Sequence, residues 1–259
     1  MPTDLLEIVT SCFRADLFKG KVVLVSGASS GIGLELGRGF ARLGGEVIAT
    51  GSNADKLKAA ASHPDNRGVR FVHLDVRDTR AITTFAASIP TLDVLINAAG
   101  IGRGEAEHTE EVFLEVIDVN LNSVMRLCIA FREHLKRSVG CIINISSMLS
   151  YLVEPEVPAY TASKTGLLGL TRALAHAYGP DHVRVNTISP GYHKTAMTEP
   201  LWSQPKSRDL IANHSALKRW GVTEDLVGTA LFLASPAAAF VTGVDIPVDG
   251  GYVVGNTIR

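Results

Sequence analysis

Tyr160 and Lys164 stand four residues apart in the stretch PAYTASK, just inside a segment whose pattern predicts a helix. Residues four apart share one face of a helix, so the lysine ammonium can approach the phenol and favour its ionised form. A phenol tuned in this way is suited to acid/base chemistry. The alternative is an exposed helix flank whose lysine lays its aliphatic stem along the surface. The pair alone does not distinguish the two interpretations.

Asn120 is a polar residue on an otherwise apolar helix face. A helix is predicted from about Glu110 to Arg137, and its inward stripe comprises Phe113, Val116, Ile117, Leu121, Val124 and Cys128. Asn120 follows Phe113 by seven residues and therefore shares that face. Because a buried amide without a hydrogen bond is costly, Asn120 is either a satisfied core residue or an amide that holds a water or a backbone group at an active site.

The loop SGASSGIG, residues 26–33, carries Gly27, Gly31 and Gly33 between an apolar strand and a helix. Glycines in this context let the backbone approach a phosphate, and the helix N-terminus attracts its negative charge. The loop predicts a dinucleotide site, with a merely tight turn as the alternative. A Walker phosphate loop is excluded because no Gly-Lys-Ser/Thr sequence follows.

The same residues also match G-x-S-x-G, the motif around a hydrolase nucleophile, with Ser29 as its serine. A hydrolase needs an oxyanion loop from an upstream strand, and an acid and a histidine downstream. Here almost nothing precedes the first strand, and no histidine lies in a recognisable hydrolase context. A serine hydrolase with its nucleophile elbow at Ser29 is kept as the alternative function.

The elements that position these residues alternate along the chain. Short apolar runs rich in β-branched residues are KVVLVSG from Lys21, EVIATG from Glu46, VRFVHLDV from Val69, LDVLINAAG from Leu92, GCIINISS from Gly140, VRVNTISPG from Val183 and VDIPVDGG from Val244. Helical patterns separate most of them, which predicts an α/β fold with a parallel sheet covered by helices on both faces. The polar motifs follow the runs, at the edge where open parallel sheets bind ligands.

The composition favours a small-molecule partner. Of the 259 residues, 46% are hydrophobic and 20% are charged, as expected for one large globular domain. A net charge of −1 gives no electrostatic reason to expect binding to nucleic acid or to a membrane surface. Residues 1–20 match neither a signal peptide nor a membrane span, and they are predicted to form an N-terminal extension before a single domain over residues 21–259.

The three cysteines, Cys12, Cys128 and Cys141, are odd in number and widely spaced. No C-x-x-C pair occurs among them. This usage argues against a disulfide framework and against a zinc knuckle. The sequence therefore predicts no metal site and a reducing, cytoplasmic location.

Taken in order, these motifs resemble the short-chain dehydrogenase/reductase family over residues 21–252. The matching features are the G-x-x-x-G-x-G loop from Gly27, Leu74-Asp75-Val76, Asn97-Ala98-Ala99-Gly100, Asn120, Ser147 in NISS, Tyr160 and Lys164 in YTASK, and Ser189-Pro190-Gly191. The spacing of 13 residues from Ser147 to Tyr160 is that of the family. The combination is far more specific than any single motif.

The resemblance implies a Rossmann-like, doubly wound domain with seven parallel strands in the order 3-2-1-4-5-6-7, and a bound nicotinamide dinucleotide. It implies that Tyr160 is the acid/base for a substrate oxygen while hydride moves between the substrate carbon and the nicotinamide. Lys164 is then expected to lower the phenol pKa and to bind the nicotinamide ribose. Ser147 is expected to hydrogen-bond the substrate oxygen, and Asn120 to hold a water that connects the lysine to solvent.

The resemblance also implies the cofactor contacts. Asp75 and the backbone of Val76 are expected at the adenine, and Thr195 at the pyrophosphate or the carboxamide. His193 stands where the family more often has an aliphatic residue. In the family, the backbone next to this position normally contacts the carboxamide of the nicotinamide, so the departure concerns that contact. The expected cofactor-binding residues are Gly27, Ser29, Ser30, Gly31, Ile32, Gly33, Ser52, Asn53, Asp75, Val76, Asn97, Ala98, Gly100, Tyr160, Lys164, Pro190, Gly191, His193 and Thr195.

The end of the second strand bears on the choice between NAD and NADP. An acid there binds both ribose hydroxyls and repels a 2′-phosphate. Here EVIATGSN ends in Gly51, Ser52 and Asn53, with neither an acid nor a following arginine. Because Ser52 and Asn53 can donate hydrogen bonds to a phosphate that meets no negative charge, NADP(H) is favoured over NAD(H). Lys56 and Arg38 are further candidate partners of that phosphate.

The substrate, a small alcohol or carbonyl compound, is expected between residues 148–157 and a mobile loop over about 192–217. A rival interpretation is a dinucleotide-binding regulatory protein that has lost its chemistry. The complete set of Asn120, Ser147, Tyr160 and Lys164 argues against that rival.

The helix that carries Tyr160 also carries the small residues Ala162, Gly166 and Gly169, which allow another helix to approach closely. Packing on its own sheet is the alternative explanation of these residues. The resemblance implies assembly through this helix and the long one before it, so a homotetramer, or else a dimer, is predicted.

Overall fold

The computed structural model describes residues 4–255 and contains one seven-stranded sheet in the order β3-β2-β1-β4-β5-β6-β7. Every neighbouring pair of strands is parallel. The strands are β1 (Val22–Ser26), β2 (Glu46–Gly51), β3 (Val69–His73), β4 (Val94–Asn97), β5 (Cys141–Ile145), β6 (Arg184–Pro190) and β7 (Asp245–Val248). The predicted α/β class and strand order are therefore confirmed. Because the chain returns from β3 to place β4 beside β1, a topological switch point opens between these two strands, where such sheets bind ligands.

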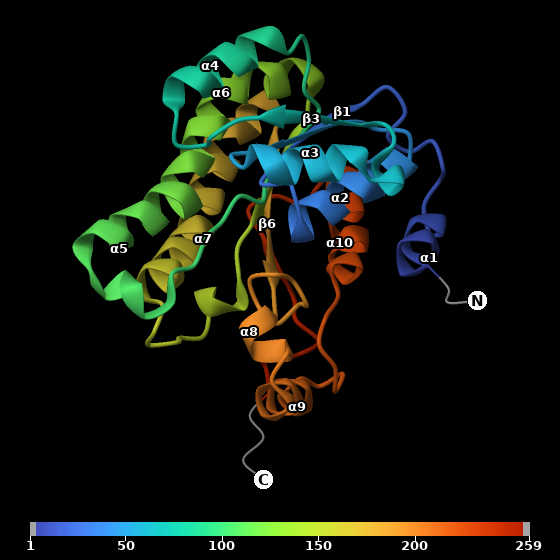
Figure 1. Ribbon diagram of the computed structural model, residues 1–259. Coiled ribbons are helices and arrows are strands. Elements are labelled where there is room, and N and C mark those ends of the chain that lie inside the picture. The colour runs from blue at the N-terminus through green and yellow to red at the C-terminus, as the bar shows by residue number, and fades with distance from the viewer. Residues whose placement is uncertain (1–3, 256–259) are drawn as a thin grey trace.

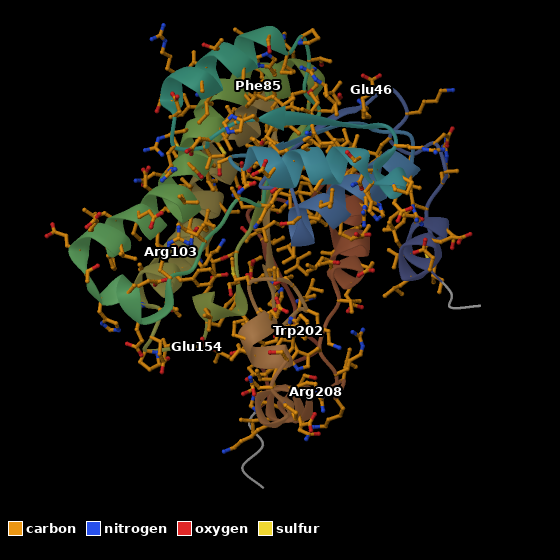
Figure 2. The ribbon with its side chains drawn as sticks, viewed as in Figure 1. Glu46, Phe85, Arg103, Glu154, Trp202 and Arg208 are labelled. Atoms are coloured by element: carbon orange, nitrogen blue, oxygen red, sulfur yellow. The ribbon has the colours of Figure 1, made fainter. Side chains whose placement is uncertain are left out.

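The helices lie on both faces of this sheet (Figure 1). The α-helices are α1 (Leu5–Ser11), α2 (Gly31–Arg42), α3 (Ala54–Ser62), α4 (Thr79–Ser88), α5 (Glu110–Ile117), α6 (Ser123–Ser138), α7 (Pro158–Tyr178), α8 (Glu199–Trp202), α9 (Pro205–His214) and α10 (Val227–Ala234). Helices α4, α6 and α7 gather on one side, and α2 and α10 on the other, while α8 and α9 project away from both layers (Figures 1 and 2). Within residues 4–255, no helix combines the length and the apolar character needed to cross a bilayer.

Two apolar cores, one on each face, hold the layers to the sheet. In the first, Phe85 of α4 meets Phe131 of α6 edge to face, with ring centroids 6.1 Å apart. In the second, Phe40 of α2 packs against Phe18, with centroids 4.6 Å apart. The inner strand β5 is buried along its whole length, as expected for a parallel strand covered on both faces. The two apolar cores therefore fix the strands, and with them the carboxyl edge of the sheet, from both faces.

The segment predicted as an extension, residues 1–20, contains helix α1 and Phe18. The Asp4 carboxylate caps α1 by accepting a hydrogen bond from the Leu6 N–H at 3.0 Å. The Leu6 side chain is 3% exposed and belongs to the second core, and α1 contacts both α2 and α10. Helix α1 and Phe18 therefore pack on the helices that cover this face of the sheet.

The helix predicted from about Glu110 to Arg137 is interrupted in the structure. Helix α5 ends at Ile117, and α6 begins at Ser123 after η3 (Asp118–Asn122), which is a π-turn. A π-turn adds a residue to one turn and changes which side chains share a face, and such turns often mark functional sites. This turn contains Asn120, which is fully buried.

Candidate active site

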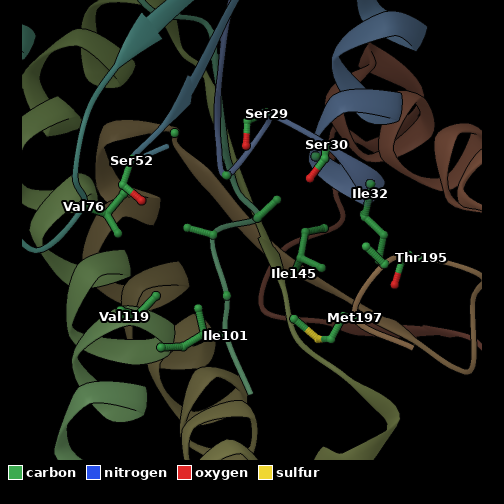
Figure 3. Close-up of a pocket in the computed structure, with 18 of the residues that line it drawn as sticks. Ser29, Ser30, Ile32, Ser52, Val76, Ile101, Val119, Ile145, Thr195 and Met197 are labelled. Atoms are coloured by element: carbon green, nitrogen blue, oxygen red, sulfur yellow. The ribbon is translucent and has the colours of Figure 1, made fainter. Parts of the chain in front are cut away.

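A cleft of about 430 Å³ lies along the carboxyl ends of the strands, a size suited to a small-molecule or cofactor site (Figure 3). Ser52 and Val76 lie towards one end of the close-up, and Ile32 and Thr195 lie towards the other. The structure brings every predicted cofactor contact except Asn97 to the lining of this cleft, together with Ser147, Tyr160 and Lys164.

The glycine loop requires the absence of side chains. Gly27 has a φ of +72°, and a Cβ placed on it would stand 2.5 Å from the backbone of Ala99. A Cβ on Gly33 would stand 2.5 Å from the carbonyl oxygen of Gly27. Helix α2 begins at Gly31, and its N-cap residue Ser30 makes no side-chain capping hydrogen bond. The first N–H groups of α2 therefore lie at the cleft without a side-chain cap, an arrangement that fits a pyrophosphate.

The residues after β2 place one cation at the cleft. Ser52 and Asn53 line it, and the Asn53 Oδ1 caps α3 by accepting a hydrogen bond from the Lys56 N–H at 2.8 Å. Lys56 also lines the cleft. Arg38, the other candidate, instead pairs with Glu35 at 3.0 Å. A phosphate at this position would thus meet hydrogen-bond donors and Lys56.

Asp75 lines the cleft as predicted, but its carboxylate is already paired with Arg77. The Arg77 guanidinium approaches to 2.7 Å, and the Arg77 N–H donates to the same carboxylate at 2.9 Å. This guanidinium holds the pKa of the Asp75 carboxyl below its usual value. Arg77 itself lines the cleft and was not predicted, although its position two residues after Asp75 allows a local side-chain pair.

Two predicted site residues lie behind the cleft wall. Asn97 is 2% exposed, and its amide donates to the Asn144 Oδ1 at 2.8 Å, so its side chain does not reach the cleft. The Asn120 Oδ1 accepts a hydrogen bond from the Ile101 N–H at 2.8 Å. The Asn120 Nδ2 donates to the Ile101 carbonyl at 2.9 Å and to the Ser163 Oγ at 3.1 Å. Asn120 therefore holds a backbone group beside the cleft, and the water expected there stays a prediction.

Tyr160 and Lys164 lie one turn apart near the start of α7. The Lys164 Nζ donates to the Ile145 carbonyl at 2.9 Å and stands 5.5 Å from the centre of the Tyr160 ring. Burial lowers the pKa of the Lys164 ammonium to about 8. Ser147 follows β5 and acts on the pKa of Tyr160, and all three residues line the cleft.

Several groups act on the pKa of the Tyr160 phenol. Desolvation raises it, the neighbouring Ser147 hydroxyl opposes that rise, and the negative charges of Glu107 and Glu154 add to it. The Lys164 ammonium is hydrogen-bonded to the Ile145 carbonyl in this structure. The lowering of the phenol pKa expected from Lys164 stays a prediction.

The turn after β6 accommodates the unusual histidine and places Thr195. The His193 ring is buried, and a Cβ on Gly221 would stand 2.6 Å from it, so the ring packs against that glycine. Thr195 lies beside Gly31, with 4.0 Å between its methyl group and a Cβ position on the glycine. The Thr198 Oγ1 accepts from the Thr195 N–H at 3.1 Å and donates to the His193 carbonyl at 2.6 Å. Thr198 lines the cleft and was not predicted, although its T-x-x-T spacing is visible in the sequence.

The segment 192–217, predicted to be a mobile loop over the substrate, contains α8 and α9. The Trp202 Nε1 donates to the Thr195 carbonyl at 3.0 Å. The Tyr192 hydroxyl hydrogen-bonds the Glu154 carboxylate, which ties the segment to the loop after η4 (Met148–Ser150). Figure 2 labels Trp202 and Glu154 on these two parts of the chain. The Trp202 hydrogen bond lies within the segment, whereas the Tyr192 hydrogen bond joins the segment to the loop after η4.

Ser29 does not have the surroundings of a hydrolase nucleophile. A Cβ placed on Gly51, at the end of β2, would stand 3.2 Å from the Ser29 Oγ. His193, the histidine among the described residues that line the same cleft, follows β6, and its Nδ1 hydrogen-bonds the Gly191 carbonyl at 3.1 Å. Among the described residues, no hydrogen bond joins Ser29 to His193.

Comparison with known proteins agrees with this geometry. A family model described as enoyl-(acyl carrier protein) reductase matches residues 27–253. Gluconate 5-dehydrogenase of Gluconobacter oxydans is 38% identical over 250 residues, which cover 92% of this chain and 98% of that protein. The 2-dehydro-3-deoxy-D-gluconate 5-dehydrogenase of Bacillus subtilis is 40% identical over 243 residues, covering 91% of this chain and 95% of that protein.

A solved structure shows the same architecture. The gluconate 5-dehydrogenase of Burkholderia cenocepacia, in complex with NADP and tartrate, superposes with a TM-score of 0.85 at 30% identity, covering 94% of this chain and 99% of that chain. The two relatives described above are named dehydrogenases, and they match the chain over nearly its whole length. This chain therefore belongs to the short-chain dehydrogenase/reductase family.

Proposed function

We propose that this enzyme transfers a hydride between NADP(H) and a carbinol or carbonyl carbon of a small polyhydroxy compound, with a sugar acid as the expected class. The relatives reported above support the substrate class, since all three are named for gluconate or a deoxygluconate derivative. The observation that carries the chemistry is the meeting of Ser147, Tyr160 and Lys164 in one cleft, with an uncapped helix N-terminus at the same cleft.

The bound nicotinamide supplies or accepts the hydride, and the chain's own groups manage the proton and the orientation. The Tyr160 hydroxyl gives a proton to the substrate oxygen during reduction and takes one during oxidation. The Ser147 hydroxyl hydrogen-bonds that oxygen and fixes it against the phenol. Lys164 places a buried positive charge next to the phenol and binds the ribose. Asn120 keeps the Ile101 backbone in place along the cleft.

The preference for NADP(H) rests on the residues after β2. Ser52 and Asn53 carry donors, Lys56 adds a positive charge at the cleft, and none of the three residues at the end of the strand, Gly51 to Asn53, is acidic. A 2′-phosphate is therefore attracted rather than repelled at this end.

The cellular setting belongs to the same proposal. All three cysteines are free, and burial raises the pKa of Cys128 to about 12 and that of Cys141 to about 11, so both are unreactive thiols suited to a reducing cytoplasm. We also expect a homotetramer, formed through the exposed small residues of α7.

The test is a substrate screen with the purified enzyme. Sugar acids, their keto forms, sugar alcohols and β-ketoacyl thioesters are assayed with NADP(H) and with NAD(H), following nicotinamide absorbance. We expect turnover of at least one sugar acid or keto sugar acid, with the higher kcat/KM for NADP(H). Turnover confined to acyl thioesters would contradict the substrate class, and absence of binding to either dinucleotide would contradict the proposed function as a whole.

A further inference from the structure

We propose that Glu107 is a positioning residue for Tyr160, holding the tyrosine through its backbone without touching substrate. Glu107 lies in η2 (Gly104–His108), in the loop between β4 and α5, and it is 53 residues away from Tyr160 in the sequence. The inference rests on the proposed function, because it assigns a role relative to Tyr160 as the acid/base.

Both carboxylate oxygens of Glu107 have backbone partners. The Oε1 accepts a hydrogen bond from the Arg103 N–H at 2.8 Å, and the Oε2 accepts one from the Tyr160 N–H at 2.8 Å. The residue is 1% exposed. Burying a carboxylate costs free energy unless its oxygens accept hydrogen bonds, and here each oxygen of Glu107 accepts one from the backbone. Glu107 therefore links the loop along the cleft to the first turn of α7.

The first turn of α7 needs such a partner. Its N-cap residue is Val157, which has no capping oxygen, and Pro158 and Ala159 precede Tyr160. Tyr160 is thus the third residue of the helix, in the turn whose N–H groups have no intrahelical acceptor. The Glu107 carboxylate fills the place of a cap, and its negative charge is favourable at a helix N-terminus. Without it, the turn that carries the phenol is the part of α7 that frays first.

The carbonyl side of Tyr160 is held as well. The Ser163 Oγ donates to the Tyr160 carbonyl at 2.7 Å and accepts from the Asn120 Nδ2 at 3.1 Å. Asn120 in turn binds the Ile101 backbone. The backbone of Tyr160 is therefore connected on its N–H side, through Glu107, and on its carbonyl side, through Ser163, to the same loop that follows β4. That loop lies against the phenol, since a Cβ on Gly102 would stand 3.7 Å from the Tyr160 ring.

The charge of Glu107 also acts on the phenol. The titratable groups that influence or face Tyr160 are Glu107 from η2, Glu154 from the loop after η4, and Lys164 from α7 itself, and the Ser147 hydroxyl also acts on the pKa of the phenol. The negative charge of Glu107 raises the pKa of the phenol. Removing that charge is therefore expected to lower the pKa of Tyr160, which a purely structural residue would not do.

The first variant is Glu107→Gln, which keeps the shape but offers one acceptor oxygen where the carboxylate offers two. We expect kcat to fall by at least about tenfold, because small displacements of a catalytic group are costly, while the NADPH dissociation constant from fluorescence titration stays within about twofold. In alcohol oxidation, kcat/KM rises with pH as the phenol ionises, and this limb is expected to move to lower pH. Glu105→Gln, at an exposed glutamate in the same turn, is the matched control. It should leave kcat and the pH limb unchanged.

The second variant, Ser163→Ala, separates position from charge. It releases the Tyr160 carbonyl without removing a charge, so kcat should fall while the pH of the limb stays in place. Both variants are measured only after circular dichroism and NADPH binding have shown that they fold.

The outcomes distinguish this inference from the function on which it rests. If Tyr160→Phe removes turnover, but Glu107→Gln keeps the parent kcat and pH profile, the positioning role is wrong and the proposed function stands. A fall in kcat with an unmoved pH limb in a folded Glu107→Gln variant also overturns the role as stated. If Tyr160→Phe keeps the parent rate, the proposed function fails, and the inference fails with it.

Discussion

Lys164 couples the stability of the protein to pH. Burial lowers the pKa of its ammonium from 10.5 to about 8 in the folded state, whereas the unfolded chain keeps the ordinary value. Below about pH 8 both states hold the proton, and the folded state bears the full cost of burying the charge. Between about 8 and 10.5 the unfolded chain binds more protons, so stability rises with pH.

The corresponding prediction concerns Lys164→Met. Across that pH window, we expect the unfolding free energy of the parent to rise relative to the variant by up to about 3 kcal/mol. Urea denaturation at a series of pH values measures the difference. Parallel curves for parent and variant would show that the buried ammonium does not titrate in this way.

Lys56 provides the test of cofactor choice at the residue scale. It is exposed at the edge of the cleft, so its contribution is that of a solvated charge. Lys56→Ala is expected to weaken NADPH binding by about three- to tenfold and to leave NADH binding nearly unchanged, by fluorescence titration. Lys58→Ala, on the same helix but outside the cleft lining, is the control. Equal weakening of both cofactors would contradict a phosphate contact.

The sequence was informative where a residue's role depends on its own local backbone. The glycines of the loop and the pair of Tyr160 and Lys164 could be placed because a turn or a helix fixes their surroundings. Glu107 and Ser163 could not, because each acts on Tyr160 through a hydrogen bond that exists only after distant segments meet. Asn97 was assigned to the cofactor site from the family resemblance, but its side chain hydrogen-bonds Asn144 while the residues after it, Ala98 to Gly100, line the cleft.

Helix α1 is an element whose contribution could not be deduced from its sequence. Leu6 is 3% exposed, whereas Ile8, two residues along, is 45% exposed. The Leu6→Ala variant is expected to lower the unfolding free energy by about 2–4 kcal/mol, because it leaves a cavity between α1 and the second core. Ile8→Ala should change it by no more than about 0.5 kcal/mol. Chemical denaturation compares the two, and equal effects would mean that α1 does not pack as described.

At the same scale, apolar strand patterns predicted a parallel sheet, whereas the order of its strands followed from the family resemblance. The pattern cannot give that order, because buried parallel strands look alike in sequence. The break between α5 and α6 was missed since a π-turn shifts the helical face by one residue without any proline or glycine to mark it. That shift places Asn120 against the Ile101 backbone.

The whole molecule is proposed to be a homotetramer, and α7 offers a way to test it. A Cβ on Gly166 would stand 3.0 Å from Leu121 of the same chain, so this glycine serves internal packing. Ala162, Gly169 and Ala173 are exposed instead, and a Cβ on Gly169 meets nothing within 4 Å. These three residues form a smooth surface on which a second helix can pack.

Gly169→Arg is expected to convert a tetramer into smaller species in sedimentation velocity, because the long charged side chain blocks close approach of a helix. Ser62→Arg, at an exposed position of α3, adds the same charge elsewhere and should leave the assembly intact. A parent protein that sediments as a monomer, or a Gly169→Arg variant with the parent's assembly, would contradict this surface.

The central claim is that Tyr160 handles the proton while the rest of the cleft binds the dinucleotide. The most direct measurement is single-turnover hydride transfer by Tyr160→Phe, paired with an NADPH fluorescence titration of the same preparation. Loss of the hydroxyl should lower the rate by at least about a hundredfold and change the NADPH dissociation constant by less than about threefold. A variant that binds NADPH and still transfers hydride at the parent rate would contradict the account.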